Sequence, residues 1–139
     1  MNNLLQGKKG IIFGALNDKS IAWQVALKCH EQGAQIVLTN APVAMRMGEI
    51  NELSTICNAQ VIPCDVSKNE DMDNLIDKSM EILGGKIDFV LHSIGMSVNV
   101  RRGNPYTHQD YNFTKTGWDV SALSFHRTMS VLYNKDAVS

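Results

Sequence analysis

Four short apolar segments, rich in β-branched residues, alternate with stretches of helical periodicity along this chain of 139 residues. The segments lie near 9–14, at 35–40, at 60–64 and at 86–95. Strands that are apolar throughout are typical of a parallel sheet covered by helices on both faces. Because right-handed crossovers join such strands, the pattern predicts an α/β fold with a doubly wound, Rossmann-like parallel sheet.

Helical periodicity fills the gaps between these segments. We expect helices over about 20–32, 43–57 and 114–133, and a further one that follows the third strand. Ser67 and Glu70 form the pattern of a capping box at the start of that further helix. The polar stretch 96–110 predicts a long loop. Four strands are fewer than the about six of a complete sheet of this kind, so we expect a single domain over 1–139 that is incomplete at its C-terminus.

Composition excludes several classes of function. The net charge is −1, from 13 basic and 14 acidic residues, and gives no electrostatic reason to expect nucleic acid or an anionic membrane as a partner. The three cysteines are scattered without a C-x-x-C pair, and the four histidines show no ligand spacing. We therefore expect no metal site and buried thiols in a reducing compartment, which indicates the cytoplasm.

The segment "GALNDKSIA" at 14–22 joins the first strand to the first helix. A helix N-terminus offers free N–H groups and a partial positive charge, which attract a phosphate. Gly14 would let the backbone approach a ligand closely, and Ser20 stands at the N-cap, where its hydroxyl can serve the helix or a phosphate. The loop has one glycine where the usual G-x-G-x-x-G fingerprint has three, so an ordinary strand-to-helix turn explains it equally well.

The ends of the second and third strands would lie at the same edge of the sheet, where ligands of such folds bind. Asn40 and Ala41 stand where many NAD sites have an acidic residue that binds the ribose hydroxyls. Arg46 lies nearby and could bind a 2′-phosphate, so NADP remains a possible cofactor. Asp65 can accept a hydrogen bond from an adenine amino group, while Val66 packs against the ring. A solvated arginine and a helix-capping aspartate are the simpler explanations.

The fourth strand ends in "HSIGMS" at 92–97. Small residues there would let a flat ribose and nicotinamide lie over the backbone, and Gly95 permits a positive φ or a close approach. A glycine that merely ends a strand is the alternative. Four consistent loops at one edge of a sheet argue together for a dinucleotide-binding domain.

These motifs carry a family resemblance. "GALNDKSIA" resembles the G-x5-S-I-A loop of bacterial enoyl-acyl-carrier-protein reductases, which belong to the short-chain dehydrogenase/reductase superfamily. The resemblance extends to "CDV" at 64–66, "IDFVLHSIG" at 87–95 and "DVSALSF" at 119–125. It implies the N-terminal, NADH-binding half of an enzyme that reduces trans-2-enoyl thioesters carried on acyl carrier protein in fatty-acid biosynthesis. For the full-length family it also implies a homo-oligomer, a tetramer.

The resemblance further implies the residues that would bind. The pyrophosphate would lie against Gly14, Ala15, Ser20 and Ile21. Ala41, Asp65 and Val66 would contact the adenosine, although the family often has a larger polar residue at the position of Ala41. The nicotinamide ribose would lie against Ser93, Ile94 and Gly95, and Ser97 would contact the substrate.

The family's catalytic pair is Y-x6-K, placed after a fifth strand. None of Tyr106, Tyr111 and Tyr133 has a lysine seven residues later. Tyr111 and Lys115 do form Y-x-x-x-K, the superfamily spacing that puts both side chains on one helix face, but Tyr111 comes too soon after the fourth strand. We therefore predict no catalytic residue in this chain and no reductase activity for it alone.

Three other interpretations remain open. The chain could belong to another short-chain dehydrogenase, or be a non-catalytic nucleotide-binding module, although a module with four strands would leave an apolar sheet edge exposed. A receiver-like domain phosphorylated on Asp65 is the third. Such a domain needs paired acids after the first strand to hold Mg²⁺, and Gly14 and Ala15 stand there instead.

Overall fold

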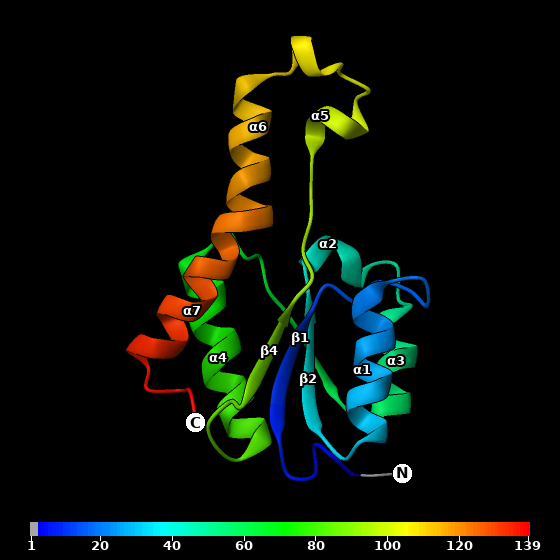
Figure 1. Cartoon of the computed structure of the whole chain (residues 1–139), viewed down its shortest axis with the longest axis vertical. Coiled ribbons are helices and arrows are strands. Elements are labelled where there is room, and N and C mark those ends of the chain that lie inside the picture. Colours follow the sequence, from blue (N-terminus) through cyan, green and yellow to red (C-terminus); the bar gives the residue numbers. More distant parts are fainter. Residues whose placement is uncertain (1–2) are drawn as a thin grey trace.

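A computed structural model describes residues 3–139 and contains a four-stranded parallel sheet with helices on both faces (Figure 1). The strands are β1 (Lys9–Phe13), β2 (Gln35–Asn40), β3 (Gln60–Pro63) and β4 (Phe89–His92). Their order is β3-β2-β1-β4, and Ile11 of β1 lies opposite Val37 of β2 and Val90 of β4. The predicted doubly wound α/β fold is confirmed.

Helices cover the two faces of the sheet in pairs. α1 (Ile21–Glu31) and α3 (Ile50–Cys57) lie on one face, and α4 (Asn69–Leu83) and α7 (Ser124–Asn134) on the other (Figure 1). Successive strand residues point to opposite faces, so Ile11 joins the core beneath α4 and α7 while Ile12 joins the core beneath α1 and α3. Both side chains are fully buried. Burial on two faces explains why the central positions of β1 and β2 are consecutive apolar residues.

Two details of the predicted helices are wrong. The helix expected over 43–57 is divided into α2 (Pro42–Met45) and α3, because Gly48 between them adopts a left-handed φ of +75° that a continuing helix does not allow. Ser67 is not a helix cap either. Lys68 is the N-cap of α4, and the Ser67 hydroxyl instead donates to Asp65 Oδ1 at 2.6 Å.

The stretch predicted as a long loop contains a short helix, α5 (Val98–Arg101), and a 3₁₀ turn, η1 (Tyr106–His108). The chain is then helical from Tyr111 to Asn134, through α6 (Tyr111–Trp118), a π-helical turn η2 (Asp119–Leu123) and α7. This helix begins three residues earlier than the sequence predicts. α5 and α6 together project beyond the carboxyl ends of the strands (Figure 1).

The sheet edge beside β4 is covered at its start. Ile87 and Val138 form a parallel bridge, with the Ile87 amide donating to Ala137 O at 2.7 Å and the Ser139 amide donating to Ile87 O at 3.1 Å. The sequence predicts that this edge is exposed. The segment just before β4 is instead paired with the segment around Val138.

The three cysteines, Cys29, Cys57 and Cys64, are free thiols and all buried, as predicted. Within residues 3–139, no helix combines the length and the apolar character that crossing a membrane requires.

Candidate functional site

The carboxyl ends of the four strands open into a cleft of about 590 Å³, a size typical of ligand pockets. The last residues of β1 and β2 and the segments that follow β3 and β4 form its walls, and η2 closes one side with Val120. β2 and β3 lie on one side of β1 and β4 lies on the other, so the order of the strands reverses between β1 and β4. Ligands of doubly wound folds bind at this switch point.

Gly14 brings the loops after β1 and β4 together. It has φ +94°, and its amide donates to Thr39 O of β2 at 3.1 Å. A β-carbon in its place would overlap the carbonyl oxygen of Ser93. The glycine is therefore required by a close approach inside the chain itself, and not only by a ligand as the sequence analysis expected.

Ser20 is the N-cap residue of α1, as predicted, with extended φ and ψ of −70° and 139°. Its side chain does not cap the helix, however. Ser20 Oγ accepts the amides of Leu16 and Asn17, both at 3.1 Å, and thereby folds the loop back on itself. The first N–H groups of α1 have no partner within a helix and no side-chain cap, which leaves them available to an anion.

Asn40 ties the end of β2 to the first loop. Its side-chain amide donates to Ala15 O at 2.8 Å, and its Oδ1 accepts the Ala41 amide at 2.8 Å. Ala15 itself is fully buried, so it supports the loop from behind. Sequence reasoning treated Asn40 only as the absence of a ribose-binding acid and missed this role, because the partner is 25 residues away.

Asp65 presents a carboxylate at the cleft wall. Its Oδ1 accepts from the Ser67 hydroxyl at 2.6 Å and the Ser67 amide at 3.0 Å, while Asp71 Oδ2 accepts the Asp65 amide. The hydrogen bond from the Ser67 hydroxyl is the main reason that the pKa of Asp65 is below its usual value. Among the described residues nothing donates to Oδ2, so an ionised acceptor remains for a ligand.

Cys64 lies in the same wall but is not a nucleophile. Burial, reinforced by the negative charges of Asp71 and Asp65, raises the pKa of its thiol to about 12. A thiol that stays protonated at neutral pH is weakly reactive. Cys64 therefore contributes packing to the cleft.

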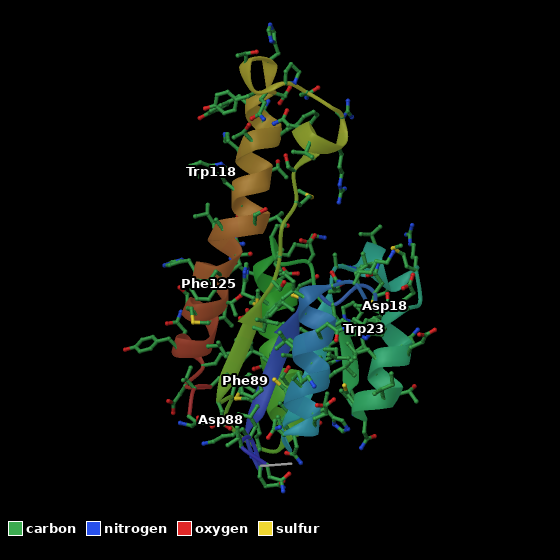
Figure 2. The ribbon with its side chains drawn as sticks, turned by 45° about the vertical axis from the view of Figure 1, so that its right-hand side comes forward. Asp18, Trp23, Asp88, Phe89, Trp118 and Phe125 are labelled. Atoms are coloured by element: carbon green, nitrogen blue, oxygen red, sulfur yellow. The ribbon has the colours of Figure 1, made fainter. Side chains whose placement is uncertain are left out.

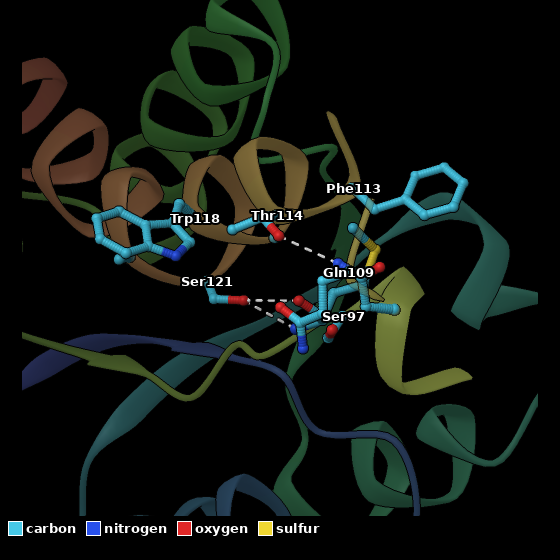
Figure 3. A pocket seen from close by; sticks show the side chains of 10 residues that line it. Ser97, Gln109, Phe113, Thr114, Trp118 and Ser121 are labelled. Carbon is cyan, nitrogen blue, oxygen red and sulfur yellow. Dashed lines mark hydrogen bonds between the residues drawn. The ribbon is translucent and has the colours of Figure 1, made fainter. Parts of the chain in front are cut away.

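The loop after β4 is held by a serine of η2. Ser121 Oγ accepts the Met96 amide at 2.9 Å and donates to Met96 O at 3.1 Å, which satisfies both main-chain groups of one residue (Figure 3). Gly95, one residue earlier, has a φ outside the left-handed region and open space where a β-carbon would stand. Nothing in the chain itself therefore requires glycine at this position.

A second pocket, of about 430 Å³, adjoins the cleft beside α6 (Figure 3). Met96 lines both, whereas Ser97, Trp118 and Ser121 line the second pocket but not the cleft. Ser97 is the N-cap of α5, and its Oγ accepts the Val100 amide at 3.2 Å. Sequence reasoning did not foresee this pocket, because it predicted only a long loop over the stretch 96–110 that supplies Ser97, Asn99 and Gln109.

The cleft brings together five of the eleven residues that the family resemblance implies, namely Gly14, Ala41, Asp65, Val66 and Ile94, and it is also lined by Asn40 and Arg46. Ser20 and Ile21 line a separate groove beside α1, and Ser97 lies in the second pocket. Ala15 is buried behind the loop, while Ser93 and Gly95 follow β4 without lining either pocket. The cleft also contains residues that sequence reasoning missed: Lys68, Met96 and Val120. Met96 and Val120 lie within the quoted segments 92–97 and 119–125, but the sequence assigned them no contact. Val120 reaches the cleft only because the fold brings η2 over the sheet.

The Tyr111 and Lys115 side chains do lie together, with Lys115 Nζ 5.5 Å from the centre of the tyrosine ring. They belong to α6 and line an outer hollow with Trp118 and Leu123, away from the cleft. Tyr111 is 74% exposed. The geometry thus gives this pair no contact with the site.

Comparisons with known proteins place this architecture. A family model described as enoyl-(acyl carrier protein) reductase matches residues 14–135. A curated relative from Rhizobium meliloti (strain 1021), an enoyl-[acyl-carrier-protein] reductase [NADH] 2, is 38% identical over 128 residues. That match covers 90% of this chain and 46% of the relative.

Solved structures agree. The FabI–NADH complex from Alistipes finegoldii matches this chain with a TM-score of 0.96 at 55% identity. The match covers 99% of this chain and 48% of the chain in that structure. The enoyl-[acyl-carrier-protein] reductase (NADH) from Aquifex aeolicus VF5 matches with a TM-score of 0.83 at 30% identity. That match covers 94% of this chain and 51% of the chain in the solved structure. This chain thus spans about half the length of the relatives that it matches.

Proposed function

Because this chain belongs to the enoyl-(acyl carrier protein) reductase family, we propose that it is the NADH-binding half of an enzyme that reduces trans-2-enoyl thioesters on acyl carrier protein. The single observation that supports this most is the cleft at the switch point of the sheet, to which all four strand ends contribute. The reaction belongs to bacterial fatty-acid biosynthesis, and the three buried free thiols suit the cytoplasm.

The cleft, together with the N-terminus of α1 outside it, offers contacts for the successive parts of a dinucleotide. Asp65 Oδ2 can accept a hydrogen bond from the adenine amino group, Val66 and Ala41 provide apolar surface, and the uncapped amides of α1 can receive the pyrophosphate. Ser20, whose Oγ already accepts two amides, still has its hydroxyl proton to donate to a phosphate oxygen.

We assign the loop after β4 to the reacting end of the cofactor. Ser93, Ile94 and Gly95 would lie against the nicotinamide ribose, and the open space at Gly95 admits a close approach there. Ser97, in the adjoining pocket, would contact the substrate. NADH supplies a hydride when it is bound. The role of this chain is to bind NADH and to orient its nicotinamide.

Exposed apolar side chains on the long helix support a homo-oligomer. Trp118, Phe125, Met129 and Tyr133 are 66%, 49%, 37% and 82% exposed, and the last three follow one helix face at a spacing of four. Trp118 projects from α6 away from the sheet (Figure 2). We call Phe125, Met129 and Tyr133 the apolar stripe on α7. We propose that this stripe packs against a second copy of the chain, within a tetramer of the full-length enzyme.

Titration of the purified chain with NADH tests the proposal. We expect a dissociation constant on the order of 0.1 to 1 mM, which is weak binding, because no Y-x6-K pair is present to add contacts. Amide NMR signals of Gly14, Asp65 and Gly95 should shift together. An Asp65→Ala variant should bind several-fold more weakly, whereas Arg101→Met, on exposed α5, should not.

Two outcomes would contradict the proposal. The first is an absence of any NADH-dependent shift at millimolar concentration. The second is shifts confined to the groove beside α1, where Ser20 and Ile21 lie. Turnover of an enoyl thioester by this chain alone would overturn the prediction that it lacks catalytic residues.

A further inference from the structure

We propose that Arg127 is a positioning residue for the adenine end of the cleft. It does not line the cleft, and it acts by fixing the main chain of the loop that does. The inference rests on the proposed function, because it assumes that an adenine nucleotide binds beside Asp65 and Val66.

Arg127 lies on α7, yet its guanidinium reaches across to the loop after β3. Nη1 donates to Val66 O at 2.7 Å, Nε donates to Asn69 Oδ1 at 3.1 Å, and Nη2 pairs with Asp119 Oδ1 at 3.2 Å. The side chain is only 23% exposed, so these interactions are partly shielded from water. A planar guanidinium holds its N–H donors in a rigid fork and so binds these three partners in fixed directions, whereas the three donors of an ammonium group rotate freely.

Apart from those to Arg127, the hydrogen bonds of this loop join residues at most six positions apart: Asp65 with Ser67, the Lys68 amide with Asp65 O, and the Asp65 amide with Asp71 Oδ2. The Val66 side chain packs into the core, but its carbonyl is held by Arg127. Local bonds set the shape of a turn but not its orientation on the molecule. Arg127, 61 residues away, holds Val66 from outside the turn and thereby sets where the Asp65 carboxylate points.

The same arginine links the two ends of the cleft. Its ion-pair partner Asp119 is the first residue of η2, and Ser121, two residues later, holds Met96 by both main-chain groups. The adenine-side loop and the loop after β4 are therefore both attached to one turn of helix. This arrangement fixes their separation, which a rigid dinucleotide site requires.

The positioning role differs from a purely stabilising one in what it predicts. If Arg127 only stabilised the fold, its loss would weaken every ligand alike or none. If it orients the Asp65–Val66 loop, its loss weakens ligands that contain adenine and spares a ligand that lacks it.

The experiment compares 5′-AMP with reduced nicotinamide mononucleotide, which has no adenosine, on the full 139-residue chain. Arg127→Met removes all three contacts and keeps most of the apolar stem. Binding is followed by the slope of amide NMR shifts with ligand concentration, which needs no saturation. Arg101→Met on α5 is the matched control, since it removes an exposed arginine far from this loop.

We expect Arg127→Met to weaken AMP binding by about fivefold or more, the scale of one ordinary hydrogen bond, and to leave the mononucleotide within about twofold. Arg101→Met should change neither. Should Arg127→Met unfold, Arg127→Gln, which keeps an NH2 donor group and loses the charge, is expected to show the same separation.

Unchanged AMP binding in a folded Arg127 variant would overturn the inference, as would an equal loss for both ligands. These results are distinct from failure of the proposed function. If the proposed function is wrong, the wild-type chain itself binds neither nucleotide. The inference about Arg127 then fails as well, because there is no adenine site for Arg127 to position.

Discussion

At the scale of single residues, the site depends on close contacts between loops that are distant in sequence. Gly14 is the sharpest case, because it meets the carbonyl of Ser93 at the point where the first and fourth strands end. A left-handed φ alone would favour glycine there, and the contact with the Ser93 carbonyl adds a steric reason.

Gly14→Ala should therefore destabilise the chain by about 2–4 kcal/mol, from the left-handed φ and the overlap combined. Gly48→Ala is the matched control. Gly48 also has a positive φ, +75°, but open space around it, so its substitution should cost only about 1–2 kcal/mol. Urea unfolding measures both, and equal losses would show that the Ser93 contact costs nothing.

A second prediction at this scale concerns His92 on β4. Burial holds the pKa of its imidazole below the usual value, and its Nε2 lies 2.8 Å from Ser124 Oγ. Because Ser124 donates its proton to Val120 O, His92 must donate from Nε2, which fits a neutral ring. The folded chain thus resists protonation of this histidine, whereas the unfolded chain accepts it.

The free energy of unfolding should accordingly fall as the pH decreases below about 6.5, the unfolded value, and level off once the pH is below the folded pKa. His92→Gln keeps a donor for Ser124 and cannot titrate. Urea titrations at a series of pH values should therefore show a shallower dependence in this variant. Parallel curves for the two proteins would contradict the assignment.

At the scale of elements, the helix from α6 through η2 to α7 is the part that organises the cleft. Its π-helical turn places Ser121 against Met96 and Asp119 against Arg127, so one irregular turn serves both neighbouring loops. Single-turn π bulges within α-helices are frequent at functional sites. The turn is thus a positioning element and not a defect.

Ser121→Ala should cost about 1–2 kcal/mol, because it leaves both main-chain groups of Met96 without their partner. The specific signature is local: hydrogen exchange at the Met96 amide should accelerate more than at the sheet amides. Thr116→Val, which removes an exposed hydroxyl bonded to Asn112 O within α6, should change stability by less than about 0.5 kcal/mol. Slow exchange at Met96 in Ser121→Ala would contradict this role.

At the scale of the whole molecule, the sheet with its covering helices forms one end of the structure and the α5–α6 projection the other (Figure 1). The apolar stripe on α7 lies on the outside of this body. A charge that is buried between two copies of the chain weakens their association far more than a charge on an open surface lowers stability. A charged substitution in the stripe therefore tests the proposed oligomer directly.

Met129→Glu should shift the chain toward monomer in sedimentation experiments, while Ile56→Glu should not. Ile56 is 55% exposed on α3 and Met129 37% exposed on α7, so both replace an apolar surface residue by the same acid. A wild-type chain that remains monomeric at every concentration tested would argue against the stripe as an interface.

The sequence by itself determined the strands, the parallel doubly wound sheet and the edge at which a ligand would bind, because burial on both faces imposes apolar runs and parallel strands end together. It also identified Asp65, Val66 and Ile94 by motif. Only the tertiary structure decided that Asn40 supports the first loop, that Ser97 lies in an adjoining pocket, and that Ser121 and Arg127 hold the cleft from η2 and α7. Those contacts join residues 25 to 61 positions apart, and no local pattern encodes a partner at such a distance.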